Sequence, residues 1–548
     1  MDGQPEARRY PDLQDHLAAL EAADLVWRID EPINKDTEIH TLARWMFRGG
    51  LPESERKAFL FTHVTDAKGR NFDIPVLVGG LAANPEIYRI GMGVPLDKIG
   101  ETWTNAIAHP IEPVVIDNPA CQEVVFQGAD LIGEGKGLDM LPVPISSPGF
   151  DVAPYLTAAN FVTVDPEDGV QNLGTYRGGL KASNRMAVRM STRPGGAGGY
   201  VHWQKYQALG DKKMPCTAIL GAPPAVAFCG PQKLPQGLDE LRVAGGLVGE
   251  PIRVTKCLTN DLMIPADCEI VIEGFVDTEF LEPEAPFGES HGHLALEDYN
   301  MIFEVTAITM KRKPVFNSII SQVTPSESSV IKRVAYEPMF LNHLRNTLGI
   351  KSVQKVVLHE PLTNIRRVIF VVMEPGTSKT EIWRALNGAA FFRADCGKIV
   401  IAVNEDIDPN NADSVFWSMA YRCNPIEDIQ IIPYRDGGHG PKGGRHGSDS
   451  TMLVDATLKA DMPPLALPKK PHMEHAKDLW DRLGLPPLKP EMPWFGYSLG
   501  DWTDEWDDMA ATALAGDYME NGRRTQQQQI SGVKPETPVR NIQDIDKT

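Results

Sequence analysis

Short β-rich runs fill the middle of this 548-residue chain and limit the folds open to it. Between about 110 and 320 they alternate with turn residues, as in AANFVTV (158–164), NLGTYRGGL (172–180), EIVIEGFV (269–276) and MIFEVTAITM (301–310). β-Branched and aromatic residues favour strands, and closely spaced runs separated by turns are typical of barrels and sandwiches. The sequence therefore predicts a central domain built on a barrel-like β-sheet.

The flanking segments carry a different pattern. Near the N-terminus, Asp12 can cap a helix with Leu13 on its apolar stripe, and a strand is expected around Val26. Ser326 can cap a second helix, and from its end to about 440 strand and helix signals alternate. We predict an α+β, multi-domain chain: an N-terminal α/β domain (1–125), the barrel-like domain (126–322), a connector helix with a C-terminal α/β oligomerisation domain (323–465), and an extension (466–548).

The extension differs from the rest of the chain. Pro-rich stretches surround two short helical segments and a group of aromatic residues, Trp494, Phe495, Tyr497, Trp502 and Trp506. These aromatic side chains are expected to pack on a neighbouring subunit. The polar segment that begins at RRTQQQQ ends the chain, and we predict that about the last 20 residues are disordered.

Composition narrows the function. A net charge of -19 argues against nucleic acid or an anionic membrane as a partner, because both require basic patches. No apolar stretch approaches the roughly 20 residues of a membrane span, and MDGQPEARRY lacks the apolar region of a signal peptide. Seven scattered cysteines without a CxxC pair suit free thiols in a reducing compartment. We expect a cytoplasmic protein that acts on small molecules.

Common nucleotide-binding motifs are missing. The chain has no GxxxxGK[ST] sequence, and PGGAGG at 194–199 does not have the GxGxxG spacing that opens a dinucleotide-binding helix. This glycine cluster is interpreted as a flexible loop, although a phosphate cradle is also compatible with it.

Chemically active side chains are densest between 282 and 293. Glu284 and Glu289 flank a Pro-Phe-Gly bend, and His291 and His293 follow. Two carboxylates that share a cleft would favour the protonated form of one of them, and such an acid could deliver a proton to carbon. On spacing alone, a solvated acidic loop explains the segment equally well.

A family resemblance favours the catalytic interpretation. EAPFGESHGH resembles the E-x-P-F-G-E-x-H-G-Y/H signature of UbiD-type decarboxylases, and the segment from Asn172 to Arg177 is similar to the family's N-x-x-x-x-R. His202 in YVHWQKY and Glu240 in PQGLDELRVAGGLVGEPI resemble metal ligands of the family, with Asp239 the competing choice for the second. Lys442 in PKGGRHG resembles the K-G-G segment that reaches the cofactor phosphate. The blocks occur in the family's order over residues 10 to 450.

The resemblance implies a cofactor and a metal. The cofactor is prenylated FMN, which a flavin prenyltransferase supplies. The metal ligands are Asn172, His202 and Glu240, and an amide oxygen, an imidazole and a carboxylate suit manganese or magnesium better than structural zinc; potassium is a further candidate ion. The implied cofactor contacts are Asn172, Gly174, Thr175, Tyr176, Arg177, Val201, His202, Glu240 and Lys442.

The implied reaction is the reversible, non-oxidative decarboxylation of an aromatic or α,β-unsaturated carboxylic acid, through a covalent bond between flavin and substrate. Protein side chains alone offer no adequate electron sink for the carbanion. Arg177, Glu284 and Glu289 are the expected catalytic residues. Glu289 would donate the proton, and Arg177 would keep Glu284 ionised. His291 and His293 are loop histidines or proton relays, and His293 stands where the family often has Tyr, which leaves the substrate open.

The same residues are compatible with further functions. They permit carboxylation, because a catalyst lowers both barriers equally. The chain could also be a flavin-binding relative without decarboxylase activity, or a metal hydrolase that uses no flavin. Cinnamic-type acids, hydroxybenzoates, heteroaromatic acids and aromatic acyl-CoA thioesters are the candidate substrates, with aromatic acids first. The resemblance implies a homodimer or homohexamer.

Overall fold

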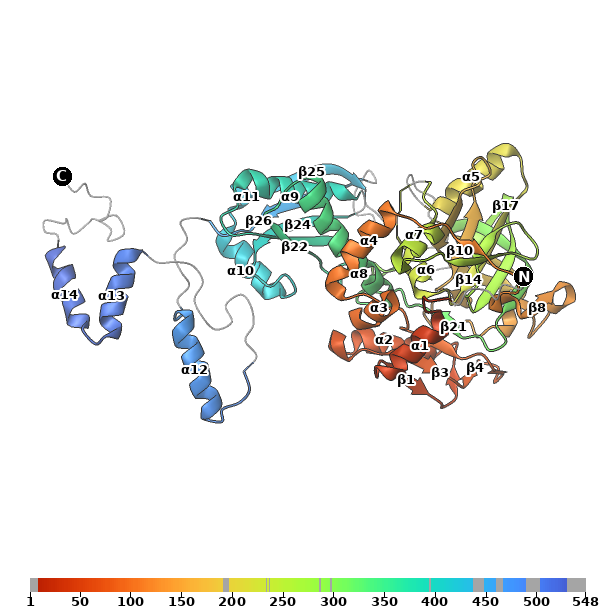
Figure 1. Cartoon of the computed structure of the whole chain (residues 1–548), viewed down its shortest axis with the longest axis horizontal. Helices are drawn as coiled ribbons and strands as arrows, with labels where there is room; N and C mark the ends of the chain where they lie inside the picture. Colours follow the sequence, from red (N-terminus) through yellow and green to blue (C-terminus); the bar gives the residue numbers. More distant parts are fainter. Residues whose placement is uncertain are drawn as a thin grey trace, which may run out of the picture. The chain divides into compact units, whose positions relative to one another are not determined.

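The computed structural model describes residues 8–190, 197–232, 234–235, 237–284, 287–295, 298–393, 396–436, 448–459, 467–488 and 503–529. The chain forms two compact units, Met1–Glu405 with Cys423–Thr457, and Asp406–Arg422 with Leu458–Thr548. Figure 1 traces both. The predicted α+β, multi-domain fold is confirmed.

The first unit begins with a small sheet and its helices. The helix predicted at the N-terminus is present as α1 (Leu13–Ala22), and the Asp12 side chain accepts a hydrogen bond from the backbone N–H of Asp15. The sheet has the order β1-β3-β6-β21, so a strand from beyond residue 310 completes it. The elements of this region are β1 (Val26–Ile29), β2 (Ile33–Asn34), α2 (Ile39–Arg48), β3 (Ala58–Phe61), β4 (Val64–Thr65), β5 (Asn71–Phe72), β6 (Val76–Val78), α3 (Pro85–Met92), α4 (Ile99–Ala108) and β21 (Phe316–Ser318).

The predicted β domain is a nine-stranded sheet. Its order is β11-β10-β14-β17-β20-β13-β12-β9, and β8 also pairs with β20. The two long strands β17 (Ile270–Glu284) and β20 (Asp298–Met310) run antiparallel through its middle. Phe161, Ile272 and Phe303 belong to one buried cluster on this sheet. The other strands are β8 (Val124–Gln127), β9 (Tyr155–Leu156), β10 (Asn160–Val164), β11 (Gln171–Thr175), β12 (Arg177–Ala182), β13 (Arg185–Arg189) and β14 (Lys213–Leu220).

Three helices and two small sheets surround this sheet. Helix α5 packs against β10, β11, β14 and β17 (Figure 1). Strands β18 and β19 form the hairpin that follows β17. The elements are α5 (Gly198–Leu209), α6 (Pro224–Cys229), α7 (Glu240–Val248), β7 (Val114–Val115), β15 (Arg253–Lys256), β16 (Met263–Pro265), β18 (Phe287–Gly288) and β19 (Leu294–Ala295). Short 3-10 turns span Glu53–Glu55, Leu96–Lys98, Ala120–Gln122, Gly128–Leu131 and Gly137–Met140.

The connector helix and the second α/β region are also present. Helix α8 (Glu327–Asn342) begins where Ser326 caps it, contains Pro338, and continues into a π-helical turn at His343–Thr347. It contacts β22, the edge of a sheet with the order β22-β23-β24-β26-β25. The remaining elements are β22 (Val353–Leu358), β23 (Val368–Met373), α9 (Lys379–Phe392), β24 (Ile399–Asn404), α11 (Pro425–Asp428), β25 (Ile429–Asp436) and β26 (Ser448–Asp455).

The second unit contains α10 (Ala412–Arg422), α12 (Lys470–Arg482), α13 (Asp504–Leu514) and α14 (Tyr518–Gln527). The sequence predicts two helices beyond 465, but the described residues of this region form three, because part of the polar segment belongs to α14. This helix pairs with α13, and Arg524 donates to Asp508 at 2.6 Å. Polar helices gain stability from such ion pairs. Trp506 lies in α13, whereas the other four aromatic residues and the last residues lie outside the described ranges.

Two expectations about composition can be compared with the structure. All seven cysteines are free thiols, and six of them are buried. Within the described ranges, no helix combines the length and apolar character that a membrane crossing requires.

Candidate active site

Arg177 binds both carboxylates of the predicted catalytic group. It is the first residue of β12, and its Nε and Nη2 donate to Glu284 Oε1 and Oε2 at 2.6 and 2.8 Å. Its Nη1 donates to Glu289 Oε1 at 2.7 Å. The fold therefore brings together three side chains from two regions of the sequence.

The two carboxylates differ in their surroundings. The Glu284 side chain is 1% exposed at the end of β17, and it also accepts a hydrogen bond from Asn300 Nδ2 at 3.3 Å. The Glu289 side chain is 22% exposed and lines a cavity. A tight turn holds Glu289, because its N–H donates to the His293 carbonyl at 3.0 Å. Glu284 thus fixes the position of Arg177 from the buried side, whereas Glu289 can contact a ligand in the cavity.

An aromatic ring lies against the guanidinium group of Arg177. The centre of its guanidinium group lies 4.6 Å from the ring centroid of Phe287, whose ring lies 4.5 Å from that of Tyr155. Burial alone would lower the pKa of Arg177, but Glu284 and Glu289 outweigh burial and raise it. The guanidinium group is therefore a fixed cation in a largely dry environment, where it can bind a carboxylate.

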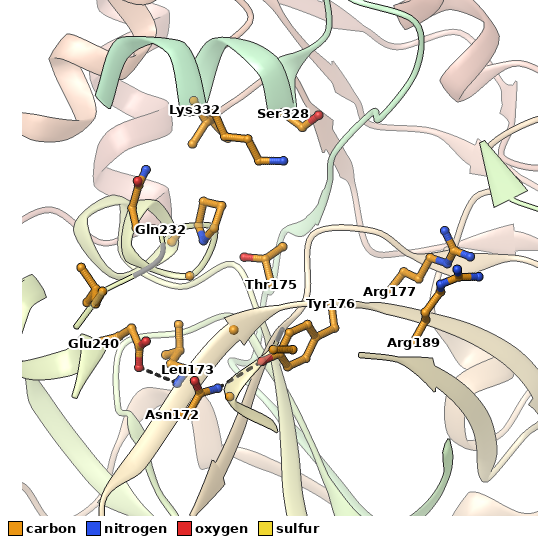
Figure 2. Close-up of a pocket in the computed structure, with 18 of the residues that line it drawn as sticks. Asn172, Leu173, Thr175, Tyr176, Arg177, Arg189, Gln232, Glu240, Ser328 and Lys332 are labelled. Atoms are coloured by element: carbon orange, nitrogen blue, oxygen red, sulfur yellow. Dashed lines mark hydrogen bonds between the residues drawn. The ribbon is translucent and has the colours of Figure 1, made fainter. Parts of the chain in front are cut away.

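A second arginine, which sequence reasoning did not find, completes this group. Arg189 pairs opposite Arg177 across β12 and β13, and its Nη1 lies 3.5 Å from Glu284 Oε2. Figure 2 shows the two arginines side by side at the cavity wall. The pairing depends on a register shift between Leu180 and Ala182, because a regular hairpin that turns at 183–184 would place residue 190 opposite residue 177.

The predicted metal ligands meet around β11. Asn172 lies in β11 opposite Thr163 of β10, and the Thr163 hydroxyl shares a hydrogen bond of 2.9 Å with His202 Nδ1. Glu240 is the first residue of α7, and its Oε2 accepts a hydrogen bond from the N–H of Leu173 at 2.8 Å. Asn172, His202 and Glu240 all line the same cavity (Figure 2 labels the first and the last).

The chemistry of these ligands fits a divalent cation. Burial raises the pKa of Glu240 to about 8, so the ionised carboxylate lacks a counter-charge that a metal would supply. Burial lowers the pKa of His202, and the neutral imidazole is the form that binds metals. Among the described residues, His, Cys, Asp and Glu alone form no group of three that could hold a metal, and the predicted set includes the amide of Asn172.

The cavity is large enough for a cofactor. Its volume is about 810 Å³, within the range of cofactor sites. A Cβ atom on Gly198 would overlap Asn172 Oδ1, and one on Gly230 would overlap Asn160 Nδ2. Glycine at these two positions therefore lets the backbone lie close to the two asparagine side chains. Gln232 also lines the cavity and is 6% exposed, and neither atom of its amide has a hydrogen-bond partner among the described residues. Because such a buried amide is costly, a ligand with donors and acceptors would satisfy it.

The other predicted cofactor contacts, Gly174, Thr175, Tyr176 and Val201, line the same cavity. The Tyr176 hydroxyl accepts from Asn172 Nδ2 and from the N–H of Gly199, both at 3.2 Å. Lys442 lies outside the described residues. Of the glycine cluster, 197–199 joins the start of α5, and 194–196 also lies outside the described residues.

Sequence reasoning did not find several residues that line the cavity. They are Ser328, Ile331 and Lys332 from α8, and Asn364, Arg366 and Arg367 from the loop between β22 and β23. The cap at Ser326 sets the phase of α8 and could have placed Ser328 and Lys332 on one face. No pattern in the sequence indicated the loop.

Known proteins share both the sequence and the fold. Residues 114–323 match the UbiD family profile described as the 3-octaprenyl-4-hydroxybenzoate carboxy-lyase Rift-related domain, and residues 330–456 match the C-terminal domain of the same family. The UbiD-class enzyme HmfF from Pelotomaculum thermopropionicum, solved with FMN, is 26% identical with a TM-score of 0.73, over 83% of this chain and 95% of that one.

Two further structures extend the comparison. An evolved dimeric form of HmfF, solved with prFMN, is 26% identical with a TM-score of 0.70, over 83% of this chain and 97% of that one. The vanillic acid decarboxylase of Sedimentibacter hydroxybenzoicus shares the fold at 21% identity with a TM-score of 0.71, over 87% of this chain and all (100%) of its own. With matches to both family domains over more than half of its length, the chain belongs to the UbiD family of carboxy-lyases.

Proposed function

We propose that this chain removes carbon dioxide from an aromatic or α,β-unsaturated carboxylic acid with the help of prenylated FMN. One observation carries the proposal: Arg177 is held by Glu284 through two hydrogen bonds and gives a third to Glu289, which faces the cavity. The solved HmfF structures with FMN and prFMN support the choice of flavin.

The residues of the cavity divide into two groups toward this cofactor. Asn172, His202 and Glu240 would hold a manganese or magnesium ion, and the amide of Gln232 would bond to polar atoms of the cofactor. When bound, the flavin supplies the electron sink that decarboxylation requires and that side chains lack.

The protein's own residues would orient the acid and move one proton. The guanidinium group of Arg177 is a permanent cation that orients the substrate carboxylate, while Glu284 fixes its position. Oε1 of Glu289 accepts the N–H of Arg177, so the proton that Glu289 delivers to carbon is carried on Oε2. Phe287 and Tyr155 shield the site, which limits the access of water.

The proposal also covers the direction of the reaction, the location of the protein and its assembly. The same residues serve carboxylation when carbon dioxide is abundant, so direction depends on concentration. We place the protein in the cytoplasm as a homodimer or larger homo-oligomer that receives its flavin from a prenyltransferase. A metal hydrolase is the competing function, and it leaves the Arg177 group without a role.

The decisive test is a visible absorbance and mass spectrum of the protein purified with a co-expressed flavin prenyltransferase. We expect bound prenylated FMN with a divalent metal, and carbon dioxide release from members of an aromatic acid panel. Protein that stays colourless after reconstitution with flavin and metal would refute the proposal and favour the hydrolase.

A further inference from the structure

Three hydrogen-bonded side chains lead from the protein interior to the wall of the cavity. They are His40 in α2, Ser318 at the end of β21, and Thr157 directly after β9. His40 Nε2 lies 2.8 Å from Ser318 Oγ, which lies 3.0 Å from Thr157 Oγ1. His40 and Ser318 are buried, whereas Thr157 lines the cavity. This His40–Ser318–Thr157 triplet therefore connects a buried imidazole with the ligand site.

Thr157 lies next to the Arg177 group. Leu156 of β9 pairs with Gly178 of β12 in antiparallel register, and continuation of this register places Thr157 opposite Arg177. Side chains at opposed positions share one face of a sheet, and both of these line the cavity. The N–H of Ile319 donates to Thr157 Oγ1 at 3.0 Å, and Ile319 also lines the cavity. The hydroxyl oxygen of Thr157 is thus held in the cavity wall near Arg177.

The surroundings of His40 select one of its two neutral forms. Burial, with a smaller effect from Arg44, lowers the pKa of His40 to about 3, so the ring is neutral and carries one N–H. Nδ1 of His40 has no hydrogen-bond partner among the described residues. A buried N–H without a partner is rarer and more costly than a bare acceptor atom. Nε2 is therefore the protonated nitrogen, and it donates to Ser318 Oγ.

His16 provides an internal comparison. Its ring is buried, and its Nε2 lies 2.8 Å from the carbonyl oxygen of Gly80. Because a carbonyl oxygen only accepts, Nε2 of His16 must carry the hydrogen. Nδ1 of His16 also lacks a partner among the described residues. The fold thus already contains one buried imidazole of the form that we assign to His40.

This form of His40 sets the direction of both hydroxyl groups. Each hydroxyl carries one hydrogen and can accept two. Once Ser318 Oγ accepts from His40, its own hydrogen points to Thr157 Oγ1. That oxygen then accepts from Ser318 and from the N–H of Ile319, which leaves the hydrogen of Thr157 for the cavity. The opposite form of His40 would reverse both hydroxyl groups, and Thr157 would donate to Ser318 instead.

We propose that His40 is a positioning residue that acts through Ser318 to make the Thr157 hydroxyl a fixed hydrogen-bond donor toward the ligand beside Arg177. The acceptor is a carbonyl-type oxygen. Under the proposed function two ligands carry such an oxygen, the flavin ring and the carboxylate of the acid. The inference rests on the proposed function for the identity of these ligands, whereas the direction of the hydroxyl groups does not depend on it.

Vibrational spectra of bound ligands test the donor. Protein with manganese is given FMN or ¹³C-carboxyl-labelled cinnamate, so no turnover is needed. Thr157→Val should shift the stretching band of the accepting oxygen and weaken binding of that ligand about three- to tenfold, as expected for one hydrogen bond. Thr157→Ser should keep both values. The matched control is Thr217→Val, which removes a buried hydroxyl with two partners at a position that is not among the described residues lining the cavity.

Nitrogen-15 NMR of flavin-free wild-type protein at pH 7.5 tests the positioning residue. Protonated and bare ring nitrogens have well-separated chemical shifts, and the signals of His40 are those missing from His40→Gln. We expect His40 to carry its hydrogen on Nε2 and to give the same pattern as His16. A hydrogen on Nδ1 of His40 would overturn the inference.

The spectra also identify the acceptor. A band shift in FMN assigns it to the flavin, and a shift in cinnamate assigns it to the substrate. Weaker binding to Thr157→Val without a shift in either ligand overturns the inference, because a purely structural role predicts that result, and unchanged binding and spectra overturn it as well. If wild-type protein binds no FMN, the proposed function fails, while the cinnamate spectra and the NMR of His40 still decide the inference.

Discussion

One arginine holds two glutamates that are chemically identical and differently placed. Glu284 receives two N–H groups of Arg177 and is buried, whereas Glu289 receives one and borders the cavity. A buried, doubly bonded carboxylate is a positioning group, and a partly exposed one can exchange a proton with a ligand. Burial and the number of hydrogen bonds therefore separate the roles of two residues that the sequence presents as a pair.

We expect Glu289→Gln to lower the turnover number by about 10² to 10⁴ while flavin absorbance is unchanged, because the amide still accepts the Arg177 hydrogen bond but carries no transferable proton. Steady-state carbon dioxide release measures the effect. The matched control is Glu282→Gln, which changes a partly exposed glutamate that pairs with Lys181. Turnover of Glu289→Gln equal to that of the control would falsify the proton-donor role.

For individual site residues, the sequence motif at 284–293 was more informative than the amino-acid composition. The motif EAPFGESHGH predicted both Glu284 and Glu289, because the two glutamates lie in one short segment of the sequence. Arg189 and Gln232 were not found, since their roles depend on cross-strand register and on burial, which adjacent letters do not encode.

Three elements, β11, α5 and α7, carry the predicted metal ligands Asn172, His202 and Glu240. The sequence left both Asp239 and Glu240 as candidate ligands at the start of α7. In the structure, Asp239 caps the helix by accepting from the N–H of Leu241 at 2.7 Å, while Glu240 bonds to Leu173 of β11 and lines the cavity. A residue used as an N-cap has its carboxylate occupied by the helix, which supports Glu240 as the ligand.

Removal of the metal should release the flavin. We expect a chelator to lower the flavin content of wild-type protein and manganese to restore it, because in the proposed site the ion would be held by Asn172, His202 and Glu240 together with the cofactor. Glu240→Gln should bind little flavin under either condition. Asp239→Asn is the control, since asparagine is an equally good cap, and flavin absorbance after gel filtration is the measurement. Full flavin content in Glu240→Gln would contradict the assignment.

The contact between α2 and β21 should respond to pH. His40 is buried, and its Nε2 shares a hydrogen bond of 2.8 Å with Ser318 Oγ. Burial, with a smaller effect from Arg44, lowers the pKa of His40 to about 3. The unfolded chain binds a proton here below about pH 6.5 but the folded protein does not, so stability is lost as the pH falls through this window.

His40→Gln, which keeps a polar contact with Ser318, should therefore gain about 2 kcal/mol of stability relative to wild type when the pH is lowered from 7.5 to 5.0. Urea unfolding of both proteins at the two pH values measures this difference. The contributions of the other titrating groups are the same in both proteins and therefore cancel. His63→Gln, which changes an exposed histidine, should show no such gain. A constant difference between His40→Gln and wild type at both pH values would rule out the mechanism.

For the whole molecule, the C-terminal sheet region leaves large apolar side chains exposed. They are Phe391, Ile426, Ile431 and Tyr434, and Tyr434 is 87% exposed. Exposed apolar side chains of this size, when they gather on one surface, commonly mark protein interfaces. We connect this surface with the proposed homodimer.

Ile426→Asp combined with Tyr434→Asp should shift the protein to a smaller assembly, because two buried charges would oppose subunit contact. Light scattering after size exclusion gives the mass. Leu209→Asp, which also replaces an exposed apolar residue with aspartate but lies in α5, serves as the control. If the double variant keeps the wild-type mass, the interface lies elsewhere.

The order of secondary structure was predictable over most of the chain, but the sheet order was not. Alternating strand and helix signals predicted the region from β22 to β26, because each element there is local. Strand β21 instead crosses back to pair with β6, and β9 pairs with β12. Such pairings depend on tertiary packing between distant segments, which periodicity does not report.

The arrangement of the nine-stranded sheet also sets the order of events as the chain is made. Arg177 and Glu284 are separated by 107 residues, and the sheet places β17 and β20 between the strands that surround the cavity. A growing chain therefore presents Arg177 well before either glutamate has been synthesised. Contacts of such long range form late. Because the cavity is lined by residues from both β11 and β12, we expect a cofactor to bind only after the central sheet has assembled.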